Sequence, residues 1–133
     1  MYEILAAIDE DADGVGAQID AIGEIAEEAD EVVVHLLHVF TDNPTGASVT
    51  QVDSAREAIK RLRERGITVH PEETSGDPAT QILEHAERED VDQICVGGRK
   101  RSPTGKALFG SVTQDVILGT ERPVLVCGRG SGS

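Results

Sequence analysis

At 133 residues, the chain fits a single domain that is long enough to bury a core without disulfides or a structural metal. Its 25 acidic and 12 basic side chains give a formal net charge of −13, which argues against binding to DNA or RNA, because the chain would repel a phosphate backbone. No apolar segment is long enough to span a bilayer, and Met1–Asp9 lacks the pattern of a secretory leader, so we expect a cytoplasmic protein that does not enter the membrane.

Short apolar runs alternate with segments of helical period along the chain. The runs predict buried strands at Tyr2–Ile8, Glu31–Phe40, Ile67–Thr74, Gln93–Gly97 and Pro123–Cys127. Between them, apolar residues spaced by three and four predict helices that begin near Val15, near Val52, at Pro78 and at Ser111. Asp77 is expected to cap the third helix. Pro78 suits the first helical position, because proline has no amide hydrogen to leave unpaired. The third strand is the most polar, which indicates a place near the sheet edge.

Strands that alternate with helices predict right-handed βαβ units. We therefore expect an α/β fold: one Rossmann-like domain over residues 1–127, with a five-stranded parallel sheet and helices on both faces. The Gly/Ser-rich residues 128–133 are expected to form a flexible tail. In such sheets ligands bind at the carboxyl ends of the strands, where the strand order reverses.

The segment after the fourth strand combines three features that favour an anion. Gly97 and Gly98 let the backbone leave the strand without a Cβ in the way. Basic residues gather in the next stretch, and Gly110-Ser111 opens a helix whose free amides attract phosphate; the basic residues are Arg99, Lys100, Arg101 and Lys106. Ser111 and Thr113 add hydroxyl groups. An ordinary capping box from Ser111 to Gln114, behind a solvated basic loop, is the alternative.

This segment resembles the signature of the universal stress protein family: Gly, two residues, Gly, nine residues, Gly, then Ser or Thr. Here the pattern begins at Gly97, has Lys100 at the second glycine and reaches Gly110-Ser111 after nine residues. The likeness extends over nearly the whole chain, at Asp9, His38-Val39, Gly76, Pro78, Ala79, Ile82, Ala86, Asp92 and Pro123–Val126.

The resemblance implies a flavodoxin-like fold, similar to the adenine nucleotide alpha hydrolases, that binds ATP, or AMP or ADP, together with Mg²⁺. By the same resemblance Val39 would offer backbone groups to adenine, and Asp9 would lie beside the base or a bound cation. Gly97 would approach the ribose, and the phosphates would be held by Gly110, Ser111, Val112 and Thr113.

The resemblance also implies a homodimeric, stress-response regulatory module rather than an enzyme. The dimer would form through Pro123–Cys127, whose apolar residues on an edge strand invite pairing. Two other functions remain open: slow ATP hydrolysis or autophosphorylation, and an interaction protein that does not bind nucleotide. Lys100 departs from the family pattern. It would either narrow the site or supply a flexible cation to the phosphates.

Three further groups contain residue types that can form a site. Asp9 to Gly14 resembles the first half of a calcium loop, but Asp20 stands where a bidentate glutamate belongs, so an acidic surface loop is the simpler interpretation. The scattered histidines form no catalytic pair, and His85 is expected on the exposed part of its helix. Cys95 and Cys127 lie in apolar runs and are expected to be buried, reduced thiols.

The acidic composition generates the first prediction. Lysines are few (Lys60, Lys100 and Lys106), and the pattern resembles proteins of halophilic archaea. Because salt screens the mutual repulsion of surface carboxylates, the protein should melt at a higher temperature in molar KCl than in dilute buffer. Circular dichroism melting curves over a KCl series measure this, and a melting temperature that is independent of salt would contradict the halophile interpretation.

Overall fold

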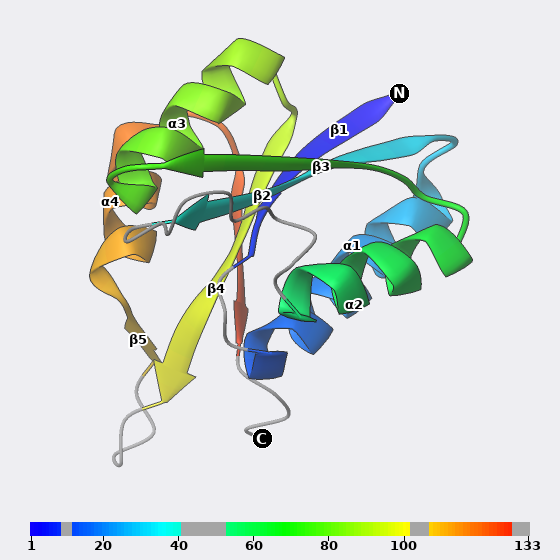
Figure 1. The fold of residues 1–133 in the computed structure, drawn as a ribbon, viewed down its shortest axis with the longest axis horizontal. Coiled ribbons are helices and arrows are strands. Elements are labelled where there is room, and N and C mark those ends of the chain that lie inside the picture. Colours follow the sequence, from blue (N-terminus) through cyan, green and yellow to red (C-terminus); the bar gives the residue numbers. More distant parts are fainter. Residues whose placement is uncertain (9–11, 41–52, 102–106, 129–133) are drawn as a thin grey trace.

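Strands from along the whole chain form one sheet in the computed structural model, which describes residues 1–8, 12–40, 53–101 and 107–128 (Figure 1). The strands are β1 (Tyr2–Ala7), β2 (Val32–Phe40), β3 (Thr68–Ser75), β4 (Gln93–Arg101), β5 (Ala107–Phe109) and β6 (Val124–Gly128). Their order is β3-β2-β1-β4, with β5 and β6 both paired to β4. All pairings are parallel except β4–β5, so the expected five-stranded parallel sheet is confirmed.

The sheet is built outward in two directions from β1. The chain first adds β2 and then β3 on one side, and later places β4 and β6 on the other. The order therefore reverses between β1 and β4, which is where ligands bind in open α/β sheets. The polar strand β3 lies at the edge, as its composition predicted.

The fourth strand is longer than predicted. It continues past Gly97 to Arg101, and Arg99, Lys100 and Arg101 pair antiparallel with residues 109, 108 and 107 of β5. The prediction that β4 ends at Gly97 was therefore wrong. A basic run carries no apolar alternation, so its backbone pairing has no signal in the side chains.

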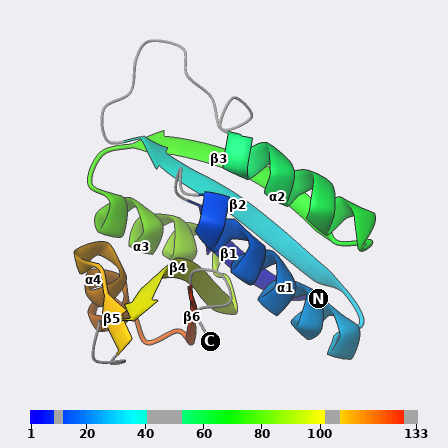
Figure 2. The same cartoon turned by 90° about the horizontal axis from the view of Figure 1, so that it is seen from below.

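Two helices cover each face of the sheet. Helices α1 (Ala12–Glu28) and α2 (Asp53–Glu64) lie on one face, and α3 (Pro78–Glu89) and α4 (Ser111–Gly119) lie on the other (Figures 1 and 2). Because side chains alternate across a strand, β2 supplies Leu36 to the core under α1 and α2, and Leu37 to the core under α3. Both side chains are fully buried. Helices on both faces are thus confirmed. Among the described residues, no helix has the length and apolarity that crossing a membrane requires.

Helix α3 confirms its predicted start and corrects one prediction. Its N-cap is Asp77, whose carboxylate accepts a hydrogen bond of 3.1 Å from the Thr80 amide, and Pro78 takes the first helical position. His85 was expected to be exposed, but it is buried at 6% exposure. It lies three residues after Ile82 and one before Ala86, so it shares their inward face.

Candidate functional site

The carboxyl ends of β1, β2 and β4 frame the edge where the sequence predicts a ligand. Helix α4 begins at this edge, directly after the β4–β5 hairpin (Figure 1). Val39, near the end of β2, and Val112, in the first turn of α4, both pack against the core on the α3 side of the sheet. These two predicted site residues therefore lie on the same face.

A side-chain hydrogen bond fastens the first turn of α4 to β4. Thr113 is buried at 5% exposure, and its Oγ1 donates to the Gly97 carbonyl oxygen at 3.0 Å. The bond joins two predicted site residues that are 16 positions apart in the sequence. The Thr113 hydroxyl was predicted to hold phosphate; in this geometry its hydrogen is used to position the helix.

The first amides of α4 are left without a side-chain cap. The N-cap is Gly110, which makes no side-chain cap hydrogen bond, and the Gln114 amide is bonded to the Gly110 carbonyl oxygen at 3.1 Å. Ser111 is already the first helical residue, so it does not act as the N-cap of a capping box. By helix geometry, the amides of Ser111, Val112 and Thr113 have no partner within the helix. Among the described residues they have no other partner, so they can receive an anion at the positive end of the helix dipole.

A buried glutamine that the sequence prediction missed ties α1 to this edge. Gln18 is 3% exposed, and its Nε2 donates to the Ala7 carbonyl oxygen at 3.0 Å and to the Cys95 carbonyl oxygen at 3.4 Å. It thus bridges β1 and β4 where the strand order reverses. The sequence could have indicated that Gln18 is buried, because this residue lies on the apolar stripe of α1, next to Ile19 and three residues after Val15.

A histidine fixes the backbone at the end of β1. His38 is 4% exposed, and its Nδ1 lies 2.7 Å from the Ile8 carbonyl oxygen. A carbonyl only accepts, so Nδ1 carries the hydrogen and donates it. The His38 ring also meets Phe40 edge-on at a centroid distance of 4.5 Å. The hydrogen bond from His38 therefore positions Ile8, which directly precedes Asp9 in the chain.

Two of the predicted site residues lie partly or wholly outside the described structure. Asp9, predicted beside the base and as a cation ligand, is outside the described residues. The backbone of Lys100 is in β4, opposite Leu108, but its side chain is not described. The calcium-loop interpretation is excluded because Ala12–Asp20 is helical.

The two cysteines are buried, as expected, but they are also neighbours. Their Sγ atoms lie 3.6 Å apart across β4 and β6, in a contact that the sequence did not suggest. The hydrogen bond with Cys127, together with burial, raises the pKa of the Cys95 thiol well above its ordinary value. A thiol with a raised pKa is a weak nucleophile, which fits a structural role.

A cavity of about 630 Å³ lies between the carboxyl ends of α3 and α4. Its lining is Leu83, Glu84, Glu87, Gly119, Thr120, Glu121 and Arg122. Arg122 is already paired with Glu87 at 3.0 Å and with Asp90 at 3.0 Å. The remaining acidic side chains repel phosphate, so the amino end of α4 is the better candidate for an anion.

The fold and this edge define an α/β protein with an uncapped helix terminus where the strand order reverses. Residues 1–128 match the universal stress protein family. A universal stress protein of Methanocaldococcus jannaschii, MJ0531, is 35% identical over 78 residues, which is 56% of this chain and 46% of the relative. The alignment thus spans less than half of that relative.

Solved structures share the fold over almost the whole chain. A universal stress protein from Archaeoglobus fulgidus superposes with a TM-score of 0.75 at 28% identity, covering 96% of this chain and 98% of that one. A second, from the same organism and in complex with dAMP, gives a TM-score of 0.70 at 22% identity, with coverage of 96% and 98%. The chain belongs to the universal stress protein family.

The bond between Thr113 and Gly97 gives a testable prediction. Thr113→Val keeps the shape of the side chain but leaves the half-buried Gly97 carbonyl without its donor, so the free energy of unfolding should fall by about 1–3 kcal/mol. Thr113→Ser keeps the hydroxyl, so its free energy of unfolding should fall by only about 0.8 kcal/mol, the contribution of one buried methyl group. Urea unfolding measures both, and a valine variant as stable as the wild type would contradict this role.

Proposed function

We propose that this chain binds an adenine nucleotide at the carboxyl edge of its sheet, with the phosphates on the amino end of α4. The observation that carries the proposal is the uncapped first turn of that helix, at the edge where the strand order reverses. Gly110 has φ −68° and nothing within 4 Å of an added Cβ, so its surroundings are open. An anion there meets free amides and the helix dipole.

The local charge differs from that of the chain as a whole. A net charge of −13 repels a nucleotide, so the site needs its own positive potential. β4 ends in Arg99, Lys100 and Arg101, and the hairpin that they form leads into Gly110. We assign these cations to the approach of the phosphates, and in this account Lys100 supplies a charge where the family pattern has glycine.

The remaining roles follow the family. The dAMP complex of the Archaeoglobus fulgidus protein supports adenine as the base. In our proposal the ligand is ATP with Mg²⁺, and AMP or ADP are the alternatives that a titration compares. Val39 would present its backbone to the adenine, Gly97 would approach the ribose and Asp9 would face the base or the cation.

We assign the chain a regulatory role in the stress response of the cytoplasm, not a catalytic one. His38 lies near the edge, but its Nδ1 hydrogen is given to the Ile8 carbonyl, and the ring is buried. Because its ring is withdrawn from solvent, it is poorly placed to act as a general base for attack on a phosphate. Slow hydrolysis is the second candidate, and phosphate release that follows protein concentration through purification would promote it. The third candidate is an interaction protein of the same family that does not bind nucleotide. Its basis is Lys100, which stands where the family pattern has glycine.

A matched pair of variants at Gly110 tests nucleotide binding. Gly110→Asp and Gly110→Asn both introduce good N-cap residues, so both should leave the melting temperature unchanged or slightly raised. The aspartate also places a negative charge on the phosphate site. In calorimetric titrations with ATP and Mg²⁺ in high KCl, we expect affinity to fall at least tenfold more in the Asp variant than in the Asn variant.

The outcomes separate the candidate functions. Saturable binding by the wild type that the Asp variant loses supports the site. Equal binding by the wild type and both variants would mean that the nucleotide does not bind at the amino end of α4. An absence of binding by the folded wild type would favour the interaction protein.

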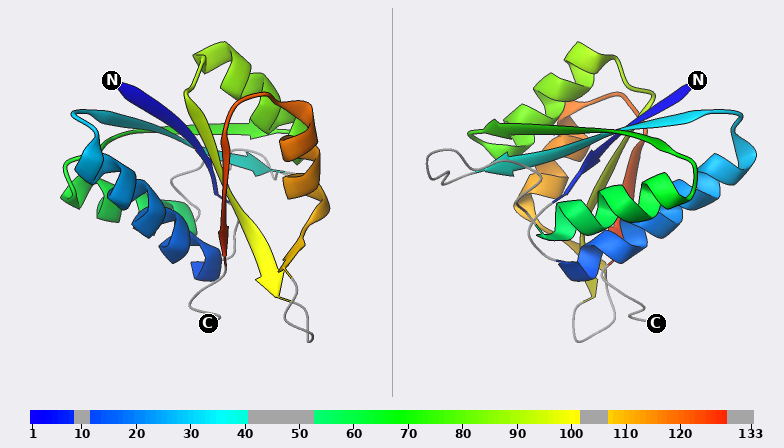
Figure 3. Two further views of the ribbon diagram at one scale, coloured as in Figure 1. Left: turned by 180° about the vertical axis from the view of Figure 1, so that it is seen from behind. Right: turned by 45° about the vertical axis from the view of Figure 1, so that its right-hand side comes forward.

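We also propose a homodimer through β6. Ile94 N donates to the Pro123 carbonyl oxygen at 3.0 Å, so the alternation of a parallel ladder turns the polar groups of Val124 and Val126 away from β4. No described strand pairs with that side, and Figure 3 shows β6 running alongside β4. Val124, Leu125 and Val126 are only half-buried. An apolar edge of this kind favours pairing with a second copy.

The dimer is tested by removing one outward amide hydrogen. Val126→Pro deletes a donor that faces away from β4, whereas Val126→Thr keeps both the donor and the β-branched shape. Light scattering should give the wild type and the Thr variant twice the 14.1 kDa chain mass, and the Pro variant a single chain mass. A monomeric wild type, or a folded Pro variant that remains dimeric, would contradict the proposal.

A further inference from the structure

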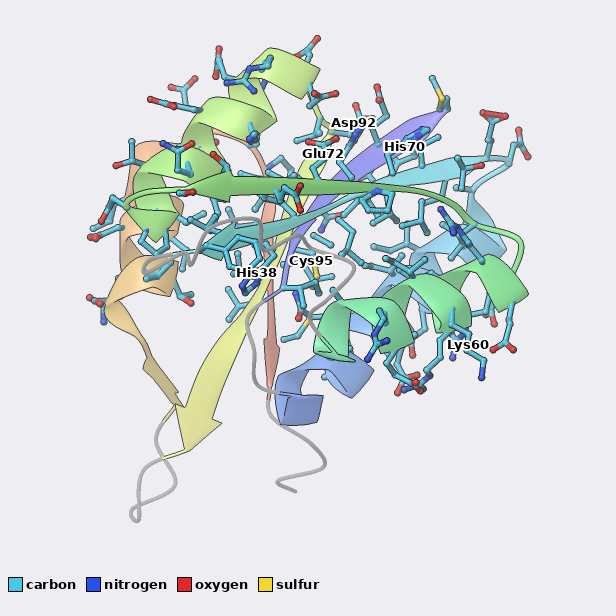
Figure 4. All side chains as sticks on the ribbon, in the orientation of Figure 1. His38, Lys60, His70, Glu72, Asp92 and Cys95 are labelled. Atoms are coloured by element: carbon cyan, nitrogen blue, oxygen red, sulfur yellow. The ribbon has the colours of Figure 1, made fainter. Side chains whose placement is uncertain are left out.

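A buried histidine on the α3 side of the sheet is surrounded by carboxylates from three other elements. His35, on β2, is 6% exposed. Its Nε2 lies 3.0 Å from Glu3 Oε1 on β1, and its Nδ1 lies 2.9 Å from Glu72 Oε2 on β3 and 3.6 Å from Glu89 Oε2 on α3. Figure 4 shows Glu72 and His70 on the α3 side of β3, with Cys95 and Lys60 on the other.

We propose that His35, Glu72 and Glu89 form a binding site for a divalent transition-metal ion of the Zn²⁺ type, with Glu3 orienting the histidine. One ligand atom from each of the three residues lies within 4.8 Å of the others. Tetrahedral zinc with bonds near 2.0–2.1 Å separates its ligands by roughly 3.3 Å. The Nδ1 distances of 2.9 and 3.6 Å lie on either side of that value, so small side-chain shifts would admit the ion.

The role of Glu3 distinguishes this cluster from an ordinary group of acidic side chains. A histidine that binds a metal through one ring nitrogen donates the hydrogen on its other nitrogen to a carboxylate, which fixes the tautomer and the ring orientation. Here Nδ1 faces Glu72 and Glu89, while Nε2 faces Glu3. The ring is therefore held with one nitrogen toward the paired carboxylates and the other toward the orienting carboxylate.

Charge and ligand type indicate which ions fit. A neutral imidazole with Glu3, Glu72 and Glu89 carries three negative charges, and a divalent cation offsets two of them. Imidazole favours zinc, copper, iron or nickel, whereas magnesium and calcium prefer oxygen ligands alone. The Glu72 and Glu89 side chains are 22% and 31% exposed, so an ion can reach them from solvent and keep a water as its fourth ligand.

A protonated histidine is the competing explanation for the same contacts. Burial opposes the charge on His35, but hydrogen bonds to Glu3 and Glu72 and the charges of Glu72 and Glu89 outweigh it and raise the pKa of His35. A salt-bridged imidazolium satisfies both nitrogens without an ion. The two explanations differ in one observable property, which is saturable binding of a metal.

The site is also separate from the nucleotide edge. Glu3 lies near the start of β1, and Glu89 is the last residue of α3, whereas the proposed phosphate site is at the first turn of α4. Metal binding can therefore be measured without nucleotide, and it does not depend on the proposed function.

The test is a titration of metal-free protein with ZnCl₂ by calorimetry and with CoCl₂ by visible absorption, in the absence of nucleotide. We expect one ion to bind per chain through this cluster. His35→Gln should abolish binding, and Glu72→Gln and Glu89→Gln should each weaken it at least tenfold. Glu3→Gln should weaken it about 10- to 100-fold, as the loss of orienting carboxylates does elsewhere.

Controls address the other groups that bind zinc. His70→Gln removes a histidine whose ring centroid is 5.6 Å from that of His35 but which is not a ligand in our proposal, so affinity should be unchanged. The Cys95→Ser, Cys127→Ser variant removes the thiols and should also bind normally. Melting curves confirm that each variant is folded; Glu89→Gln, at the end of α3, is the variant least disruptive to the core.

Three results would overturn the proposal. The first is a wild type that binds no Zn²⁺ at this stoichiometry, which leaves a salt-bridged imidazolium. The second is unchanged affinity in folded Glu72→Gln and Glu89→Gln. The third is binding that disappears with the cysteines, which would place the ion between β4 and β6.

Discussion

The nucleotide site that we propose depends on how the first turn of α4 is held against the sheet. The hydroxyl of Thr113 donates to the carbonyl of Gly97, and this bond joins the helix to the strand beside the point where the strand order reverses. The N-cap is a glycine without a side-chain acceptor, so the following amides stay unpaired within the helix. Gln18 and His38 hold the neighbouring strand ends through the carbonyls of Ala7, Cys95 and Ile8. Preorganised donors of this kind bind an anion without first having to be ordered.

The acidic side chains of the chain have different counter-charges in three parts of the structure. At the edge where we propose that nucleotide binds, basic residues at the end of β4 precede the first turn of α4 in the chain. Beneath α3, three carboxylates converge on one buried histidine, where either a proton or a metal ion must offset them. Between α3 and α4, Arg122 is shared by Glu87 and Asp90. These last pairs are largely exposed and contribute little to stability, whereas the histidine cluster is partly withdrawn from water.

Much of the fold could be predicted from the sequence, because apolar period and cap chemistry are local signals. The parallel strands, the edge position of β3 and the Asp77-Pro78 start of α3 all follow from such signals. The β4–β5 hairpin could not be predicted, since its pairing involves the backbone of a basic run. In the candidate site, Gly97 and Gly110–Thr113 were predicted, whereas Gln18 and the Cys95–Cys127 contact were missed. Contacts between residues far apart in sequence depend on strand register, and no local pattern encodes them.

The central claim is that the free amides of α4 receive the phosphates of a nucleotide, and nuclear magnetic resonance tests it most directly. In ¹⁵N–¹H correlation spectra recorded in high KCl with ATP and Mg²⁺, the amide resonances of Ser111, Val112 and Thr113 should shift progressively and saturate together. Amides on α2, on the opposite face of the sheet, should stay in place. Saturable shifts that leave these three amides unmoved, or spectra that do not change at all, would contradict the account.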